Sequence, residues 1–367
     1  MSSDVVLVIV VATALAFDFT NGFHDTANAI ATSVSTRAMS PRFAVLLSAV
    51  LNFAGAFISL KVAATVGSGI VESGAATTTV VFAGLIGAIA WNLATWYFGL
   101  PSSSSHALIG GLVGAAFAAD GANAVQGDGL VEKVIVPGVV APLLAFTVGG
   151  MAILVTYRIV GRLRPGPVNR SYRLGQLVSG SMFSLAHGTN DAQKTMGIIT
   201  LALIAHGDLS ADHFHVPAWV IVSSAAAIAL GTYTGGWRII RTMGTRIIKM
   251  DPAQGFSAQG SGAAVVLAAS HLGYPLSTTH VISGAVMGAG AATRLSAVRW
   301  GVAGNIATAW VLTLPAAGLM GAAVYAFSSV FGSGALGPLV VSISILGVVL
   351  GFLGRRMARG QVLTADV

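Results

Sequence analysis

Apolar segments follow one another along almost the whole length of this chain. They cover approximately residues 5–20, 43–64, 80–98, 105–119, 134–157, 175–205, 216–235, 261–272, 275–293, 300–327 and 337–354. Hydrophobic residues make up 55% of the chain and charged residues only 8%, and the mean hydropathy is +0.83. Backbone polar groups find no water inside a bilayer, so apolar segments of this kind cross it as helices. The composition therefore predicts an all-α, multi-pass membrane protein, although several segments are shorter than the roughly 20 residues of a full span.

The distribution of charge excludes other classes of protein. The net charge is +7, but most Lys and Arg residues lie in short connections between apolar segments. This is typical of topogenic signals, so we expect the lipid bilayer and not nucleic acid as the partner. The chain has no cysteine, which excludes disulfides, thiolate metal sites and cysteine nucleophiles. The start of the chain lacks a basic region before its apolar segment, and we interpret it as a retained first helix.

Basic residues also predict the topology. Arg37 and Arg42 follow the first segment, which places the N-terminus outside if arginines face the cytoplasm. The basic link over residues 158–173 is then cytoplasmic, and so is the C-terminus. We expect the plasma (inner) membrane of a bacterium.

A polar motif interrupts the first apolar segment and recurs near the middle of the chain. The first copy is DFTNGFHDTAN, from Asp18 to Asn28, and the second is SLAHGTNDAQK, from Ser184 to Lys194. Aligning their glycines places Asp25 on Asp191 and Asn28 on Lys194. Because an odd number of crossings separates the two copies, the halves are expected to have inverted topology, which is typical of secondary transporters.

A second pair of related segments surrounds Pro101 and Pro275. GLPSSSSHALIGG, which starts at Gly99, aligns with GYPLSTTHVISGA, which starts at Gly273. A proline followed by several hydroxyls breaks a membrane helix only where the freed backbone lines a cavity or is buried in protein. We therefore expect two re-entrant helical hairpins, one from each side, whose tips meet near the midplane.

Together these patterns predict an inverted-repeat secondary transporter with about seven full crossings and two re-entrant helical hairpins. Residues 1–157 form the first inverted repeat and residues 174–327 the second, joined by the basic linker 158–173. Residues 328–367 form a final helix and a cytoplasmic tail.

The chemistry of the site follows from the polar faces of the two motif helices. Asp18, Asn21, Asp25 and Asn28 occupy one continuous helix face, at positions i, i+3, i+7 and i+10. An ionisable side chain in the bilayer core costs about 2.5–3.5 kcal/mol, so this face should turn towards a polar interior. The equivalent face of the second motif includes Asp191.

Each hairpin adds a helix N-terminus with three hydroxyl residues, an arrangement that suits a tetrahedral oxyanion. Carboxylates would repel this anion unless they hold cations or accept its proton, and their hard oxygen ligands suit sodium or magnesium. Importing a dianion against 100 mV costs roughly 4.6 kcal/mol, which favours cation coupling over a passive channel.

The segments GFHDTANAIAT, AHGTNDAQKTMG, PSSSSH and PLSTTH, in this order, resemble the inorganic phosphate transporter (PiT) family in its compact bacterial form. The resemblance covers nearly the whole chain. It implies a homodimeric symporter for inorganic phosphate, free or as a metal–phosphate complex, which works by alternating access and has no covalently bound cofactor. The coupling cation would be Na⁺ or H⁺, with a divalent metal accompanying phosphate as a further alternative.

The resemblance also implies roles for individual residues. Substrate contacts fall to the hairpin hydroxyls and the two motif aspartates, namely Ser103, Ser104, Ser105, Ser277, Thr278, Thr279, Asp25 and Asp191. Coupling-ion contacts fall to Asp25, Asn28, Asn190 and Asp191. Supporting positions are Lys194, His24, Asn21 and Gln193.

Lys194 departs from the family pattern, since many members carry Asn at this position. A lysine there acts as a built-in cation beside Asp191, which makes proton coupling more plausible. His24, which stands where the second motif has Asn190, favours the same interpretation because imidazole titrates near neutral pH.

Rival functions remain at this stage. A symporter for sulfate or another oxyanion is the alternative, because its site would use the same donors. An intramembrane hydrolase built on Ser105 and His106 is disfavoured, since adjacent helix residues diverge and one active site would not explain the duplication. We therefore expect a transporter and not an enzyme.

Overall fold

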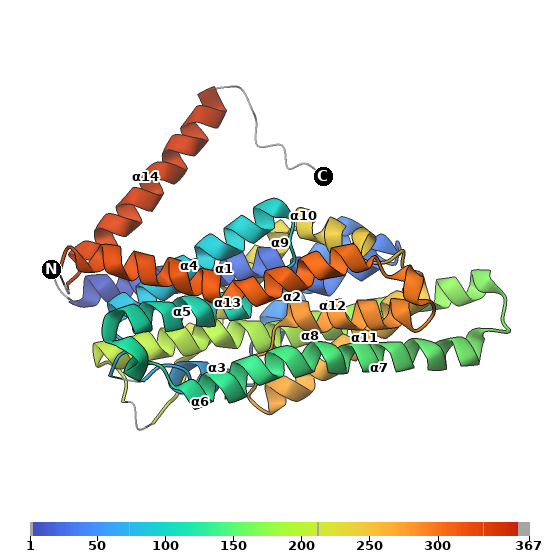
Figure 1. Ribbon diagram of the computed structural model, residues 1–367. Helices are drawn as coiled ribbons and strands as arrows, with labels where there is room; N and C mark the ends of the chain where they lie inside the picture. Colours follow the sequence, from blue (N-terminus) through green and yellow to red (C-terminus); the bar gives the residue numbers. More distant parts are fainter. Residues whose placement is uncertain (1–2, 73, 211–212, 333, 359–367) are drawn as a thin grey trace.

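The computed structural model describes residues 3–72, 74–210, 213–332 and 334–358, and its described part is helical apart from turns and one isolated bridge between Val71 and Val125. Figure 1 shows a long bundle whose helices run mostly lengthwise. In chain order they are α1 (Ser3–Ser35), α2 (Pro41–Gly55), α3 (Lys61–Ser68), α4 (Thr78–Phe98), α5 (Ser104–Asp120), α6 (Gly127–Leu130), α7 (Val136–Val160), α8 (Pro165–His206), α9 (Ala218–Thr234), α10 (Trp237–Arg241), α11 (Pro252–His271), α12 (Thr278–Ala291), α13 (Trp300–Ser329) and α14 (Leu336–Ala358).

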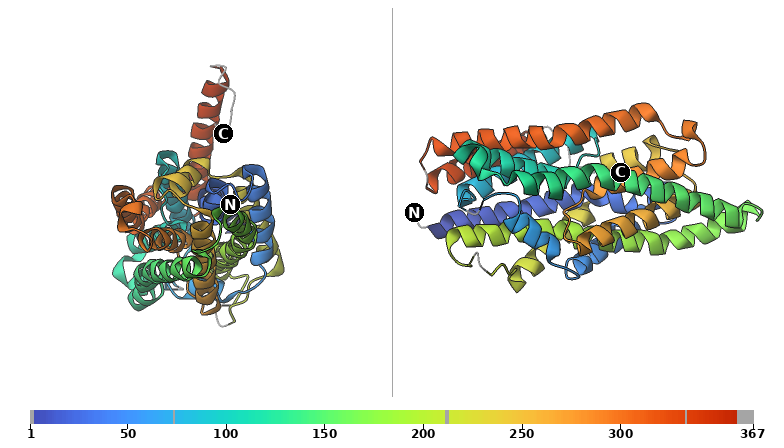
Figure 2. Two further views of the ribbon diagram at one scale, coloured as in Figure 1. Left: turned by 90° about the vertical axis from the view of Figure 1, so that its right-hand side faces the viewer. Right: turned by 60° about the horizontal axis from the view of Figure 1, so that its bottom comes forward.

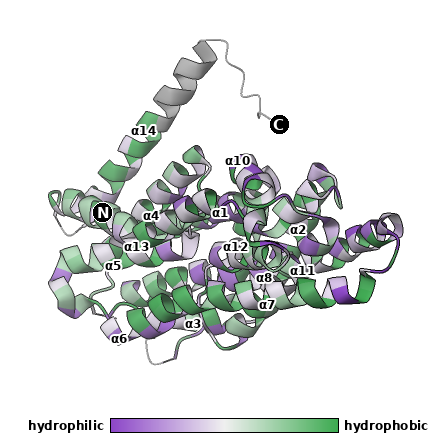
Figure 3. Ribbon diagram, turned by 45° about the vertical axis from the view of Figure 1, so that its right-hand side comes forward, coloured by the Kyte–Doolittle hydropathy of each residue, from purple (hydrophilic) through white to green (hydrophobic). Residues whose placement is uncertain are grey.

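Several helices are long and apolar enough to cross a membrane. Among the described residues, the five are Ser3–Ser35, Thr78–Phe98, Ser104–Ala124, Gly127–Val160 and Trp300–Ser329. A sixth is added if Ala218–Thr234 and Trp237–Arg246, bent by 61°, count as one broken span. Hydrophobic residues follow α7 in Figure 3, while hydrophilic ones gather where α7 gives way to α8. The all-α, multi-pass class is confirmed, whereas seven crossings and inverted repeats stay predictions.

The segment expected over residues 43–64 is two helices and not one. α2 ends at Gly55 and α3 begins at Lys61. The restart is stabilised from α8, because the side-chain Oε1 of Gln193 accepts from the backbone N–H groups of Val62 (2.9 Å) and Ala63 (3.3 Å) at the start of α3. Apolar composition alone does not reveal a break that is capped by a distant residue.

Helical hairpins occur at both predicted places. α4 packs against α5, and α11 packs against α12. The helices are interrupted around Pro101 in the first pair and Pro275 in the second. The two tips meet, since the Ser105 hydroxyl of the first hairpin donates to the Leu276 carbonyl of the second at 3.1 Å. Their re-entrant character in a membrane stays a prediction.

The second arm of each hairpin packs on a helix from the other half of the chain. α5 lies on α13, and α12 lies on α7. Both contacts are backbone to backbone. A Cβ at Gly114 would lie 2.0 Å from the Gly318 carbonyl oxygen, and one at Gly288 would lie 1.9 Å from the Phe146 carbonyl oxygen. Glycine at both places therefore allows an approach that no other residue permits.

The apolar core is divided into two clusters. One lies towards the N-terminal half of α1 and includes Phe17, Phe82 and Ile199. The other lies towards the C-terminal half of α1 and includes Ile30 and Phe183. The buried polar residues of both motifs lie between them along α1 and α8, so the polar layer is enclosed by hydrophobic packing towards both ends of the bundle.

The final helix, α14, leaves the bundle and projects away from it, as Figures 1 and 2 show. The tail predicted beyond it, residues 359–367, lies outside the described residues. Within the basic linker predicted over residues 158–173, only residues 161–164 lie between helices, because α7 ends at Val160 and α8 begins at Pro165.

Candidate substrate and cation site

The two motifs lie side by side in the middle of the bundle, where α1 packs against α8. Asp25 is 2% exposed and Asp191 is fully buried. The hairpin tips cover them, and the six predicted hydroxyl residues are all buried as well; these are Ser103, Ser104, Ser105, Ser277, Thr278 and Thr279. The structure thus brings the predicted hydroxyls and both aspartates together.

Asp25 is held by the first hairpin and by its own neighbour. The Ser104 hydroxyl donates to Oδ2 of Asp25 at 2.7 Å, and Nδ1 of His24 lies 2.6 Å from Oδ1. The Thr279 hydroxyl reaches Oδ1 from the second hairpin at 3.5 Å. Asp25 therefore contacts the tips of both hairpins.

Asp191 on α8 contacts the second hairpin as Asp25 contacts the first. The Thr278 hydroxyl donates to its Oδ2 at 3.2 Å, as Ser104 does to Asp25. Nε2 of His187, one helix turn away, lies 3.1 Å from the same oxygen, and the Lys194 ammonium pairs with Oδ1.

Lys194 and Asn28 occupy matched positions and reach across to the opposite hairpin. The Lys194 ammonium contacts Asp191, the Ser105 hydroxyl (2.5 Å) and the Leu276 carbonyl (2.8 Å). The Asn28 amide donates to Thr279 at 2.9 Å and to Thr278 at 3.3 Å. A buried cation therefore stands on one side of the site and a neutral amide on the other.

The third matched pair, His24 and Asn190, holds the hairpins in place. Nε2 of His24 lies 3.1 Å from the Thr95 hydroxyl on α4. The Asn190 amide donates to the Ser270 hydroxyl at 2.8 Å and to the Tyr274 carbonyl at 3.2 Å. These contacts connect α1 to α4 shortly before the first hairpin tip, and α8 to the end of α11 and the residues just before the second tip.

The hairpin helices α5 and α12 direct their N-termini into this region. The Ser103 hydroxyl accepts from the His106 backbone N–H at 3.1 Å, and the Ser277 hydroxyl accepts from that of His280 at 3.3 Å. Both serines are thus helix caps. First-turn N–H groups lack partners within their helix and carry the positive end of its dipole, so the paired N-termini suit an oxyanion.

Three side chains could hold a cation together. One ligand atom from each of Asp25, His187 and Asp191 lies within 4.8 Å of the others. A carboxylate and imidazole set of this kind suits a divalent ion as well as a hard monovalent one. His187 was not among the predicted site residues, although its i, i+4 spacing from Asp191 was a signal for it.

Two predicted supporting residues lie elsewhere. Gln193 caps α3 and does not contact the hairpins through any described hydrogen bond. Asn21 shares the α1 face of Asp25, but its Oδ1 has no hydrogen-bond partner among the described residues. Thr95 and Ser270, which receive the contacts from His24 and Asn190, were not predicted because no spacing rule links them to the motifs.

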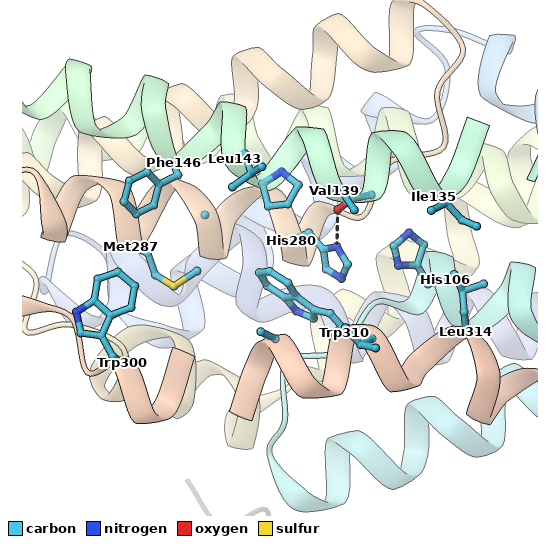
Figure 4. A pocket seen from close by; sticks show the side chains of 15 residues that line it. His106, Ile135, Val139, Leu143, Phe146, His280, Met287, Trp300, Trp310 and Leu314 are labelled. Atoms are coloured by element: carbon cyan, nitrogen blue, oxygen red, sulfur yellow. Dashed lines mark hydrogen bonds between the residues drawn. The ribbon is translucent and has the colours of Figure 1, made fainter. Parts of the chain in front are cut away.

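An apolar cavity of about 620 Å³ lies behind the hairpin helices, between α7, α12 and α13 (Figure 4). His106 and His280 line it with their ring centroids 4.8 Å apart, and the His280 ring lies 4.1 Å from that of Trp310. Most of its other lining residues are aliphatic or aromatic. This lining offers too few donors for an oxyanion.

Known proteins share both the sequence and the fold. Residues 21–167 and 162–321 each match the phosphate transporter family. A probable low-affinity inorganic phosphate transporter of Mycobacterium bovis is 56% identical over 319 residues, covering 87% of this chain and 76% of that protein. Proteins described in the same words from Rhizobium meliloti and Bacillus subtilis are 52% and 46% identical, covering 87% and 88% of this chain and 95% and 96% of their own lengths.

One solved structure is also similar. It is described as the sodium-dependent phosphate transporter, and it superposes with a TM-score of 0.78 at 26% identity, covering 88% of this chain and 98% of that one. The resemblance seen in the motifs is confirmed by these matches over most of the chain. The chain belongs to the phosphate transporter family.

Proposed function

We propose that this protein imports inorganic phosphate together with a cation across the bacterial plasma membrane. The observation that carries the proposal is the buried meeting of two hydroxyl-bearing helix N-termini with two carboxylates, between Ser104 and Asp25 and between Thr278 and Asp191. The relatives, which are named as inorganic phosphate transporters, support phosphate as the substrate.

Phosphate would bind between the hairpin tips. Hydroxyls that now donate to Asp25 and Asp191 can turn to donate to phosphate oxygens, and the first-turn N–H groups of α5 and α12 add donors of fixed direction. The Lys194 ammonium, which already contacts Ser105, would supply positive charge. The same hydroxyls would thus contact phosphate when it is bound and the aspartates when it is absent.

The coupling cation would neutralise the aspartates when phosphate is bound. The solved relative is described as sodium-dependent, which supports Na⁺. Lys194 already neutralises Asp191. Fewer mobile cations are therefore needed than in a site that has asparagine both at position 28 and at position 194. H⁺ stays an alternative through His24 beside Asp25, and the group of Asp25, His187 and Asp191 could accept the metal of a metal–phosphate complex.

Alternating access would arise from the two related halves. The paired contacts of α5 with α13 and of α12 with α7 support an inverted repeat over residues 1–157 and 174–327. Hydrophobic clusters lie towards both ends of the polar layer, so access from either side requires one cluster to open. We further propose a homodimer with the N-terminus outside and the C-terminus in the cytoplasm.

Uptake of radiolabelled phosphate into proteoliposomes tests the proposal. Sodium and proton gradients are imposed separately and then together, and both are collapsed as the control. Gradient-driven accumulation supports symport, whereas uptake that persists without gradients contradicts it. Strong competition by unlabelled sulfate would instead favour a sulfate symporter.

A further inference from the structure

The polar face of α1 extends beyond the site just described, to Asp18. This residue lies two helix turns before Asp25 and is completely buried. Neither of its carboxylate oxygens has a hydrogen-bond partner among the described residues. An unpaired carboxylate in an apolar interior is strongly unfavourable, so Asp18 stays ionised only with a positively charged partner and otherwise holds a proton.

Two further oxygen atoms beside Asp18 are also unsatisfied. The side chains of Asn21 on α1 and Thr195 on α8 lie beside the carboxyl group and interact with it, while Oδ1 of Asn21 and the Thr195 hydroxyl meet no partner at full hydrogen-bond geometry within the described part of the chain. Both residues are 1% exposed or less. Side chains from two packed helices thus gather at this carboxyl group, and their oxygen atoms can act as ligands to a cation.

Lys194 does not supply this cation, although it lies within electrostatic range of Asp18. An ammonium group has three N–H donors. Those of Lys194 are directed to Asp191, the Ser105 hydroxyl and the Leu276 carbonyl. The positive charge is therefore committed to the neighbouring site.

The surroundings of Asp18 restrict the ligand to a small ion. Phe17 and Ala14 on α1 belong to the same apolar cluster as Ala192 and Met196 on α8. An all-oxygen ligand set with one negative charge suits a hard monovalent cation, because a divalent ion would bring an uncompensated charge into this apolar shell.

We propose that Asp18, Asn21 and Thr195 form a second cation site that binds sodium. The role of the bound sodium as a coupling ion rests on the proposed function, whereas the binding site itself does not. The site has no counterpart in the other half of the chain, because Ser184 stands where the first half has Asp18. Lys194 is then the fixed cation of the second motif, and the first motif has the exchangeable one.

Equilibrium binding of radioactive sodium to the purified full-length protein, without phosphate, tests this site. Asp18→Asn removes the only charged ligand and should weaken sodium binding by about tenfold or more. Thr195→Val removes one neutral ligand and should weaken it less. The matched control is Thr200→Val, another buried α8 threonine whose hydroxyl already donates to the Met196 carbonyl at 2.8 Å, and its sodium affinity should equal that of the wild type.

Sodium binding is measured again in an Asp25→Asn background to separate the two sites. There the remaining binding should disappear when Asp18→Asn is added. Wild-type sodium affinity in both Asp18→Asn and Thr195→Val would overturn the site, and so would an absence of sodium binding to the wild-type protein. Proton-driven phosphate uptake in either case would leave the proposed function standing, whereas a protein that binds sodium at Asp18 but takes up no phosphate would refute the function and not the site.

Discussion

Lys194 is the residue that most distinguishes the two halves of the site. Its partner position in the first motif is Asn28, and both side chains reach the opposite hairpin through hydrogen bonds. The geometry is thus almost the same on both sides, while the charge is not. A fixed ammonium on Asp191 takes the place that a mobile cation would otherwise fill.

Lys194→Asn should therefore increase the dependence of phosphate uptake on sodium. The substitution gives the second motif the same aspartate and asparagine combination that the first motif has at Asp25 and Asn28, and it removes the ammonium group that pairs with Asp191. Uptake measured against sodium concentration at constant pH checks this. Lys61→Asn, at an exposed lysine on α3, is the control, and an unchanged sodium dependence in Lys194→Asn would contradict the role assigned to the charge.

Asp25→Asn and Asp191→Asn should each reduce gradient-driven uptake to the level of protein-free liposomes. Each change removes a charge that balances the cation while keeping the size of the side chain, so the protein should remain folded. Size-exclusion profiles verify folding, and Asp128→Asn, at an exposed position of α6, should transport normally. Coupled uptake that survives in either site variant would show that its carboxylate is dispensable.

The sequence predicted the site's composition better than its contacts. The structure brings both aspartates and all six hydroxyl residues together, as the duplication and the helical spacing led us to expect, while their roles stay predictions. The placement of Gln193 was missed, since it caps a helix start that apolar composition conceals. His187 was not among the predicted site residues, and the structure places its Nε2 3.1 Å from Oδ2 of Asp191.

At the scale of elements, the second helix of each hairpin packs unusually closely on a helix of the other half. α5 approaches α13 through Gly114 and Gly318, and α12 approaches α7 through Gly288. These contacts are made by backbone atoms and not by interlocking side chains. The sequence predicted where the hairpins lie from their prolines, but not which helices would receive them, because glycine spacing does not identify a partner.

Gly114→Ala and Gly288→Ala should each destabilise the fold by about 1–3 kcal/mol, because the new methyl group would overlap a carbonyl oxygen of the facing helix. Thermal unfolding in detergent measures the loss. Gly304→Ala is the matched control on α13, where a Cβ meets nothing within 4 Å. Equal melting temperatures for all three variants would show that the helices can separate freely.

At the scale of the whole molecule, the ends of the bundle should face opposite sides of the membrane. The turn at residues 36–40 and the link after α7 lie at one end, while the N-terminus and the link after α5 lie at the other (Figure 1). This grouping agrees with the distribution of arginines along the chain, and direct labelling can test it.

Single cysteines can map this arrangement, because the natural chain has none. Asn123→Cys and Asp208→Cys, at exposed positions, should react with a membrane-impermeant maleimide added to intact cells. Gly166→Cys and Ser296→Cys, also exposed, should react only after the membrane is permeabilised. Labelling of Gly166→Cys in intact cells would reverse the predicted topology.

The contact between the hairpin tips has a mechanical consequence. Ser105 donates to the Leu276 carbonyl, and Lys194 binds both groups. In a transporter that works as proposed, these three contacts hold the two hairpin tips together, since each tip is hydrogen-bonded to the Lys194 ammonium. Phosphate competes for the same ammonium and hydroxyl, so its arrival frees both tips together. Bound phosphate would thus loosen the contact between the two hairpin tips.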